Sequence, residues 1–568
     1  MTARSQITLV SAVCCLAGCV AVATAVAAYA PAMHGGFLFD DRFEIVANPA
    51  LEVLWPPWIA MFTGGSQPHR PIPYYTLAVN HAWGGLDPWG YHAVNLGIHL
   101  VNAGLAWWVV RQALRQASAA GNLRRLGPQA IAASSLVTAA IWLCHPLCTQ
   151  AVSYVYQRME SLAAMSVLVT VGSFLQSRVS ARPLRWQAAA VLAAAVGPLC
   201  KESAAAAALC VAWLEVTLAP DRGRVDVRTA IAGLTRQRWL LLGLVATWLV
   251  AGWVVWQQRG LYSEFGGPGW TPWQYLVSQP RSIARYLRLA FWPAGQQIDY
   301  LWVPPDDLAE QLPGWLVVAL LAAVVGFGLR LSPPLAAAIG TMLLLLAPTS
   351  TILPVADLCV EHRMYLPLVP LVAAVVVGGA LAVGGVFAAE EPAARDTHVA
   401  VTVLAVGMAV AMALATATWK RNHAYRSERA MWEAVLAADP THQRAAMILA
   451  GTSSAEGDFV RTEVICRRAL TGTRQFVPLQ ARLLTLLALA TPQNGGPLEK
   501  AIGYARRATM LAPNLVETHL AVGDLLFEID RPGAEAAYRR ALEIDPDHAK
   551  ARAAIQALQG GPPTSAAE

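Results

Sequence analysis

Long apolar runs separated by short polar loops fill the first 420 or so residues of the chain. A helix needs about 20 apolar residues to cross a bilayer, and the runs approach that length although several are shorter. They predict eleven membrane spans, at 7–33, 92–110, 129–143, 161–176, 187–199, 203–219, 239–257, 313–329, 335–347, 364–387 and 399–418. The pattern therefore predicts an all-α membrane domain over 1–419.

The residues after the last span have a different pattern, because Arg, Glu and Asp recur throughout and no run is long enough to span. Segments such as AEAAYRRALEIDP (534–546) and SERAMWEAVLAADP (427–440) share one register, with a period of about 34 residues. Small residues at fixed positions and a helix-terminal proline at that period are typical of tetratricopeptide repeats. In the best copy these are Ala534, Tyr538, Ala541 and Pro546. We expect an α-solenoid over 424–558 and a disordered tail over 559–568.

Composition agrees with a polytopic membrane protein, since 56% of the 568 residues are hydrophobic and 14% are charged. Soluble domains are nearer a quarter charged. The net charge of +6 comes from arginines in short loops, so we interpret it as a topology signal and expect no nucleic-acid partner. The nine cysteines have no zinc-site or CxxC spacing. We expect them to pack as small residues, with a disulfide among Cys144, Cys148 and Cys359 as the alternative.

The arginines also predict an orientation. With eleven spans and the N-terminus inside, five arginine-bearing loops face the cytoplasm, as the positive-inside rule requires. Loops 34–91, 144–160, 200–202, 258–312 and 348–363 then face outward, together with the repeats. We therefore expect a multi-pass protein of the cytoplasmic (inner) membrane whose active face and repeats are extracytoplasmic, or periplasmic.

An acidic pair, Asp40 and Asp41, follows the first span in the run FLFDDRFEIVANP. Adjacent carboxylates at the end of a span are costly unless they face water, a metal or a cation. They also suit a general base that deprotonates an acceptor at a membrane surface. The alternative is a pair that only marks the interface or caps a short helix.

A second outer feature is basic. In RSIARYLRLAFW, Arg281, Arg285 and Arg288 recur at helical spacing opposite an apolar face. Such a helix lies in the plane of the interface. It either holds a lipid phosphate or simply anchors the chain to anionic headgroups.

Several segments, in this order, resemble a known family. They are FLFDDRFEIVANP, the Arg-Pro stretch with His92, Asn95 and His99, HPLCTQAVSYVYQRMES, CKES and EHRMYLP, with repeats after the last span. The membrane domain resembles the GT-C superfamily of lipid-linked-sugar glycosyltransferases. Within it, the chain is similar to the transmembrane-and-tetratricopeptide-repeat (TMTC-like) protein O-mannosyltransferases.

The resemblance implies inverting transfer of a hexose, mannose in that family, from a polyprenyl-phosphate donor to Ser or Thr hydroxyls of exported proteins. Asp40 or Asp41 would be the base. The candidates for binding the donor phosphate are cations, because arginine can hold phosphate oxygens bidentately: Arg158, Lys201, His362 and Arg363, with Arg285 and Arg288 farther out. The supporting residues would be Glu160, Glu202, Glu361, His92 and Tyr365. The repeats would bind the acceptor protein, and membrane lipids would surround the spans.

Other interpretations remain at this point. Arg158 with Glu160, and Lys201 with Glu202, also suit structural ion pairs at span ends. His92, Asn95 and His99 suit interhelical hydrogen bonds, with a divalent metal site as the alternative. The segment YVYQRMES has no glycine ahead of Arg158, which leaves the sugar open. The acceptor could instead be a lipid or polysaccharide, and a membrane-anchored repeat scaffold without activity would explain the repeats but not the acidic pair.

Overall fold

The computed structural model describes residues 3–67, 69–218, 225–257, 270–351, 354–355, 357–472 and 476–560. These residues form helices and loops without a strand, which confirms the predicted all-α class. They divide into a first unit, Met1–Ile298 with Trp302–Glu428, and a second unit, Asp299–Leu301 with Arg429–Glu568. From residue 561 onward, the predicted tail lies outside the described residues.

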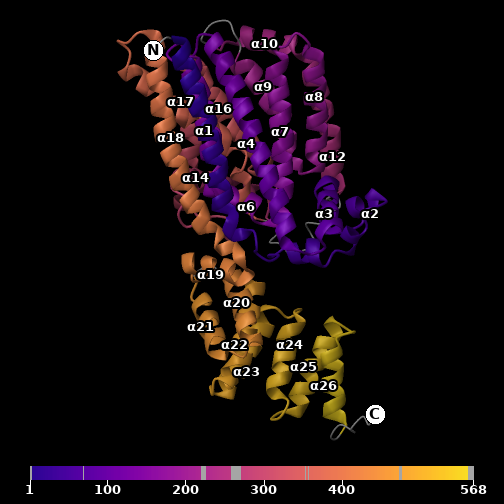
Figure 1. The fold of residues 1–568 in the computed structure, drawn as a ribbon. Coiled ribbons are helices and arrows are strands. Elements are labelled where there is room, and N and C mark those ends of the chain that lie inside the picture. Colours follow the sequence, from indigo (N-terminus) through magenta and orange to yellow (C-terminus); the bar gives the residue numbers. More distant parts are fainter. Residues whose placement is uncertain are drawn as a thin grey trace. The chain divides into compact units, whose positions relative to one another are not determined.

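The first unit contains the apolar helices (Figure 1). In chain order its longer helices are α1 (Ala3–Tyr29), α3 (Pro71–Gly84), α4 (Pro88–Ala119), α5 (Pro128–Leu143), α7 (Arg158–Ser177), α8 (Pro183–Val196), α9 (Ala207–Thr217), α10 (Val227–Arg236), α11 (Arg238–Ala246), α12 (Trp248–Gln257), α14 (Pro272–Phe291), α15 (Leu308–Leu331), α16 (Pro333–Leu346), α17 (Leu368–Val386) and α18 (Pro392–Asn422).

Each of the eleven predicted segments overlaps at least one of these helices, and 239–257 covers two, α11 and α12. Within the described residues, six helices are long and apolar enough to cross a membrane, or eight if two bent pairs each count as one span. The expected count of eleven is not reached by this criterion, because α8, α9 and α16 have only 14, 11 and 14 residues. The chain is a multi-pass membrane protein with six to eight such helices.

Glycines let some of these helices approach closely. A Cβ at Gly407 of α18 would overlap the side chain of Val137 in α5, and one at Gly172 of α7 would overlap the ring of Trp108 in α4. Small residues at such crossings are the usual means of packing helices in lipid, where helix association depends on close van der Waals contact.

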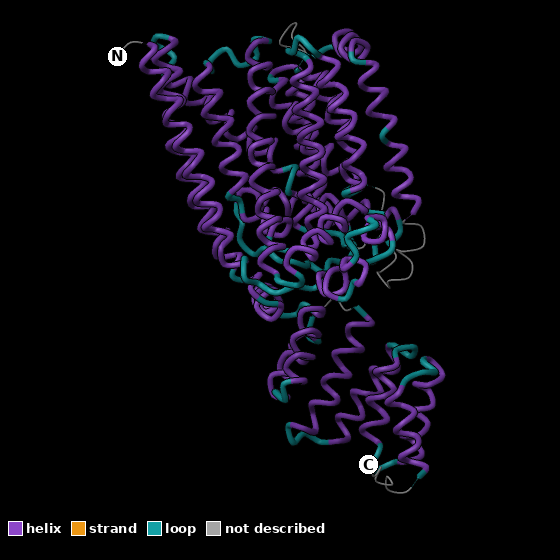
Figure 2. Tube along the Cα trace, turned by 45° about the vertical axis from the view of Figure 1, so that its right-hand side comes forward, coloured by secondary structure: helices purple, strands orange, loops and turns teal. Residues whose placement is uncertain are grey.

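The two ends of the first unit differ. Its short helices and most of its loops gather at the end opposite the N-terminus and α10 (Figures 1 and 2). The short helices with residues at that end include η2 (Arg42–Val46), η3 (Pro49–Glu52), α2 (Pro57–Phe62), η4 (Pro146–Cys148), α6 (Thr149–Val152), η5 (Val155–Gln157), η7 (Glu202–Ala206) and η9 (Glu361–Met364). The loops predicted to face outward thus meet on one side of the unit.

The second unit is a series of helices that pack as successive neighbours. They are α19 (Glu428–Ala438), α20 (Gln443–Ala455), α21 (Phe459–Ala469), α22 (Val477–Gln493), α23 (Leu498–Leu511), α24 (Val516–Leu526), α25 (Arg531–Ile544) and α26 (Ala549–Gln559). Ala534, Tyr538 and Ala541 are buried in one core cluster, and α25 ends two residues before Pro546. The predicted repeat positions therefore form the contacts between helices, as in an α-solenoid.

Candidate functional site

The acidic pair lies in the loop between α1 and η2, where the two carboxylates have different surroundings. Asp41 is fully buried, whereas Asp40 is partly exposed. The Asp41 carboxylate accepts two backbone hydrogen bonds, from the N–H of Leu38 to Oδ2 at 2.9 Å and from the N–H of Tyr156 to Oδ1 at 2.8 Å. The outer loops thus hold Asp41 in place and leave Asp40 within reach of solvent.

Burial raises the pKa of Asp41 to about 8, and the neighbouring charge of Asp40 acts in the same direction. The two backbone N–H donors oppose this shift without cancelling it. A carboxyl group with a pKa near neutral is better matched to proton transfer than an ordinary aspartate.

The backbone next to the pair is strained. Phe39 has a φ of 47°, in the left-handed region of backbone conformation that residues other than glycine seldom adopt. The N–H of Asp40 donates to the buried hydroxyl of Tyr154 at 3.0 Å, which helps to hold this turn. Strain of this kind persists only where surrounding contacts impose it, and it clusters at functional sites.

Glu44 extends the acidic motif by one turn and was missed by the sequence analysis. Its carboxylate accepts from the hydroxyl of Tyr74 at 2.5 Å and from the N–H of Ser66 at 3.0 Å, so it fastens the loop before α3 to η2. The Tyr74 hydroxyl also lies 3.3 Å from that of Tyr156. The signal was its position within FLFDDRFEIVANP, three residues after Asp41.

Two buried ion pairs adjoin this network. Lys201 Nζ lies 2.7 Å from Glu160 Oε2. Arg70 contacts both oxygens of Glu202, with Nη2–Oε1 at 2.7 Å and Nε–Oε2 at 3.1 Å. The cationic charges of Arg70 and Lys201 lower the pKa of Glu202 to about 2, although burial acts in the opposite direction. The ion pair between the neighbours Lys201 and Glu202, which the sequence suggested, is therefore not the one formed. Lys201 pairs with Glu160, and Glu202 pairs with Arg70.

His362, in η9, is buried beside these cations. Burial holds its pKa well below the usual value, and three nearby cations act in the same direction, namely Lys201, Arg363 and Arg70. Its Nδ1 atom is buried without a hydrogen-bond partner within the described structure. The four cationic or basic side chains, which we call the basic cluster (Arg70, Lys201, His362 and Arg363), thus lie near one another at the end of the unit opposite α10.

Arg363 and Glu361 are held by the backbone of outer loops. The Arg363 guanidinium donates to the carbonyls of Asp357 at 2.7 Å and Leu358 at 3.3 Å. Glu361 accepts from the N–H of Gln297 at 2.7 Å and from Nε2 of Gln296 at 3.0 Å. Glu361 therefore ties η9 to the loop after α14.

The remaining predicted residues lie deeper or apart. Arg158 is fully buried and donates to Asn95 Oδ1 at 2.6 Å and to the carbonyls of Thr76 and Tyr91, each at 3.1 Å, so it ties α7 to α3 and α4. His92 Nε2 lies 3.2 Å from the carbonyl of Gly35, at the base of the acidic loop.

Tyr365 joins α4 below the basic cluster, because its hydroxyl is 2.9 Å from His99 Nδ1 and 3.1 Å from Asn102 Nδ2. Arg285 hydrogen bonds the carbonyl of Gly295, and Arg288 is exposed on α14. No contact shown by the described residues brings these two arginines into the basic cluster.

The described residues contain no group of three or more His, Cys, Asp or Glu side chains arranged to hold a metal ion. All nine cysteines are free thiols. The disulfide alternative for Cys144, Cys148 and Cys359 is therefore not realised.

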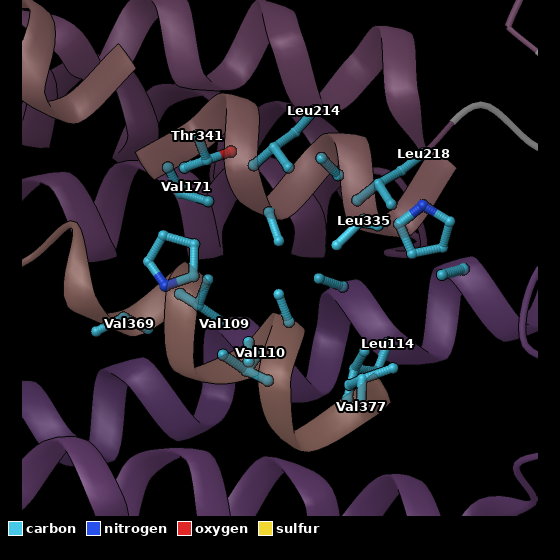
Figure 3. A pocket seen from close by; sticks show the side chains of 18 of the residues that line it. Val109, Val110, Leu114, Val171, Leu214, Leu218, Leu335, Thr341, Val369 and Val377 are labelled. Carbon is cyan, nitrogen blue, oxygen red and sulfur yellow. The ribbon is translucent and has the colours of Figure 1, made fainter. Parts of the chain in front are cut away.

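An apolar cavity begins below the basic cluster. Its volume is about 310 Å³, and aliphatic side chains of α4, α7, α9, α16 and α17 point into it (Figure 3). A small polar pocket lined by Glu160, Ser203 and Arg363 shares Val167 and Leu345 with this cavity. Charged groups thus lie at one end of an apolar channel within the membrane helices.

Comparison with known proteins agrees with the sequence motifs, although no family model matches the chain. Protein O-mannosyl-transferase Tmtc2 of Drosophila melanogaster is 31% identical over 205 residues, 33% of this chain and 20% of that protein. Tmtc3 of the same organism is 31% identical over 174 residues, 28% of this chain and 19% of that protein.

Human protein O-mannosyl-transferase TMTC4 is 28% identical over 198 residues, 31% of this chain and 26% of that protein. The chain spans about a fifth to a quarter of the length of these relatives. Together with the ordered motifs and the apolar helices, these matches show that the chain is similar to the TMTC-type protein O-mannosyl-transferases over about a third of its length.

Proposed function

We propose that this protein transfers a hexose from a polyprenyl-phosphate donor to Ser or Thr hydroxyls of exported proteins, as an inverting GT-C-type glycosyltransferase. The relatives are named protein O-mannosyl-transferases, and mannose is accordingly the proposed sugar. The proposed membrane is the cytoplasmic (inner) membrane, with the site and the repeats on its extracytoplasmic face.

The observation that carries the proposal is the proximity of an acidic pair to the basic cluster. The segment 156–160 connects them, because the N–H of Tyr156 donates to Asp41 at 2.8 Å, the sulfur of Met159 lies 2.8 Å from Arg70 Nη1, and Glu160 pairs with Lys201 at 2.7 Å. Glycosyl transfer to a hydroxyl needs a base on one side of the anomeric carbon and positive charge around the leaving phosphate on the other. This end of the first unit supplies both.

In the proposed reaction, the acceptor oxygen attacks the anomeric carbon and its proton passes to Asp40 or Asp41. The new bond is the acceptor O–C bond, and the bond that breaks joins the anomeric carbon to the phosphate oxygen. That oxygen keeps the electron pair and leaves as the polyprenyl phosphate. Asp40 is the carboxylate that an acceptor can reach, and buried Asp41 is the one with the raised pKa.

The basic cluster is the proposed phosphate site. Lys201 and Arg70 are each paired with a carboxylate, so the cluster is only partly neutralised before a phosphate binds. Arg363 belongs to the basic cluster and also lines the small pocket that adjoins the apolar cavity. The cavity is the proposed path of the first isoprene units, since it is lined almost entirely by aliphatic side chains.

The second unit is the proposed binding site for the acceptor protein. Stacked helix pairs present an extended surface that suits a peptide. Binding there would raise the local concentration of acceptor hydroxyls without adding chemistry.

The test uses the purified full chain with a Ser/Thr-rich peptide and either polyprenyl-phosphate mannose or polyprenyl-phosphate glucose. We expect one added hexose per modified residue by mass spectrometry with the mannose donor, and none on a matched peptide in which alanine replaces Ser and Thr. Folded protein that transfers neither sugar would contradict an enzyme and support the scaffold. Transfer of glucose alone would correct the sugar.

A further inference from the structure

A second cavity lies at the other end of the first unit, beside the start of α1. Its volume is about 860 Å³, and it is bounded by α1, α4, α5 and α18. Helix α1 packs mainly on α18 and α5, and the space between α1 and α4 is left partly open. This volume is within the range of sites that hold a ligand of lipid-fragment size.

The cavity is apolar at one end and cationic at the other. Gly18 of α1 and Leu136 of α5 line its inner part, toward the middle of both helices. Arg111 and Arg115 line the part nearer the C-terminus of α4. Residues four apart lie on one face of a helix, so both guanidinium groups belong to the same wall.

The two arginines are not neutralised by the protein. Among the described residues no carboxylate forms an ion pair with either one, and the buried Nε of Arg111 has no hydrogen-bond partner. Arg111 stacks on the ring of Trp107, with its guanidinium carbon 5.3 Å from the ring centroid. The wall therefore presents two positive charges, of which that of Arg111 is held by Trp107.

Asp396 is the acidic residue in the lining, and it is already engaged. Its two carboxylate oxygens accept from the N–H groups of Gln129 and Ala130, each at 3.0 Å, at the N-terminus of α5. A Cβ at Gly127 would overlap this carboxylate, so the side chain fits tightly against the helix end. Asp396 consequently directs its oxygens to the helix end and forms no ion pair with Arg111 or Arg115 among the described residues.

We propose that this cavity binds one anionic phospholipid from the leaflet at this end of the unit. The headgroup phosphate contacts Arg111 and Arg115, and an acyl chain lies along Gly18 and Leu136. Charge complementarity identifies the occupant, because a neutral lipid would leave the partly buried Arg111 and the exposed Arg115 beside it without an anion. Basic pockets between membrane helices on the cytoplasmic side are suited to such headgroups.

The bound lipid would also fill the space between α1 and α4. The acidic loop follows α1 in the chain. A lipid that keeps α1 in place would therefore also help to keep this loop in place. Binding to the folded state alone raises the temperature of unfolding as the lipid concentration increases. Anionic lipid should therefore stabilise the protein, and a neutral lipid with the same acyl chains should not.

The test is native mass spectrometry of the full chain with phosphatidylglycerol or with phosphatidylcholine of identical acyl chains. We expect wild type to retain one phosphatidylglycerol that Arg111→Gln/Arg115→Gln binds roughly 30-fold more weakly, since each cation near a lipid surface contributes about fivefold. The matched control is Arg182→Gln/Arg185→Gln, which removes two exposed arginines elsewhere and should bind like wild type.

A substitution in the apolar part of the cavity distinguishes binding at this site from general attraction of anionic lipid to the arginines. A Cβ at Gly18 would meet only Leu136, at 3.6 Å, so Gly18→Leu adds a side chain to the cavity wall at a position where the first carbon has room. It should weaken retention of phosphatidylglycerol while all arginines remain. Equal binding of phosphatidylcholine by wild type, or an equal loss in the Arg182/Arg185 control, would overturn the proposal, as would unchanged binding by both cavity variants.

Discussion

The backbone N–H of Tyr156 donates to Oδ1 of Asp41 at 2.8 Å, across 115 positions of the sequence. This bond fixes the loop after the first membrane helix to the segment that starts α7. The Tyr156 side chain continues the connection, since its hydroxyl lies 3.3 Å from Tyr74 and Tyr74 in turn binds Glu44. The position of the acidic pair thus depends on three separate outer segments.

Activity should rise with pH as Asp41 loses its proton. Its pKa is raised to about 8, so most of the group is protonated below that pH and cannot act as a base. We expect kcat/KM to increase from pH 6, to reach half of its maximum near pH 8, and to level off about one pH unit higher. A pH–rate profile measured on the free enzyme with a short peptide checks this. A flat profile across that range would exclude Asp41 as the titrating group.

Variants of the ion pair Lys201–Glu160 should distinguish its effect on stability from its effect on donor binding. Lys201→Met leaves the Glu160 carboxylate buried without its partner, and losing one member of such a pair typically costs about 3–5 kcal/mol. Glu160→Gln/Lys201→Met removes both charges, so thermal unfolding should recover most of the wild-type value. Transfer from the lipid donor should stay low in the double variant. Recovery of both properties would make Lys201 purely structural.

Glu202 should make the protein sensitive to acid. Its pKa in the folded protein is lowered to about 2, below the value of about 4.3 expected when unfolded. This group therefore contributes stability that is fully present above pH 4.3 and lost as pH falls toward 2. We expect Glu202→Gln to have a lower unfolding temperature at pH 7 and a weaker decline on acidification, measured by thermal unfolding in detergent. Parallel declines in both proteins would contradict the assignment.

Much of the fold was predictable because apolar length and repeat spacing are local properties. Each predicted membrane segment overlaps at least one helix, and Ala534 and Tyr538 are buried as the repeat register requires. The number of crossings was harder to predict, because α8, α9 and α16 are short, and because α5 and α10 are each followed by a helix that continues at an angle, of 54° and 72°. Length along the sequence does not record such bends.

The site was predictable in its acidic and basic motifs but not in its pairing. Arg70 binds Glu202 from 132 positions away, and no pattern in one sequence reveals that partner. Arg158 is a candidate by its charge, yet its hydrogen bonds to Asn95 and to backbone carbonyls place it beneath the surface of the site. Long-range packing decides which of several suitable residues face the substrate.

Removal of the second unit should affect protein acceptors more than peptides. If residues 429–568 only recruit the acceptor, their deletion should remove transfer to a folded target and spare transfer to a short peptide at high concentration. Tethering contributes on the order of 10²–10⁴ in avidity. The comparison needs both substrates with intact and truncated protein. Equal loss on both would mean that these helices maintain the membrane unit, and no loss would mean that they serve another purpose.

The role of Asp40 and Asp41 as the base can be checked with transfer by the double variant Asp40→Asn/Asp41→Asn. The control is Asp87→Asn, because Asp87 is an exposed aspartate at the N-terminus of α4 and asparagine caps a helix equally well. With lipid-linked mannose and a Ser/Thr peptide, we expect the double variant to lose about 10²–10⁴ in rate, to elute as a folded monodisperse protein, and the control to be normal. A folded double variant that transfers hexose at the wild-type rate would exclude Asp40 and Asp41 as the base.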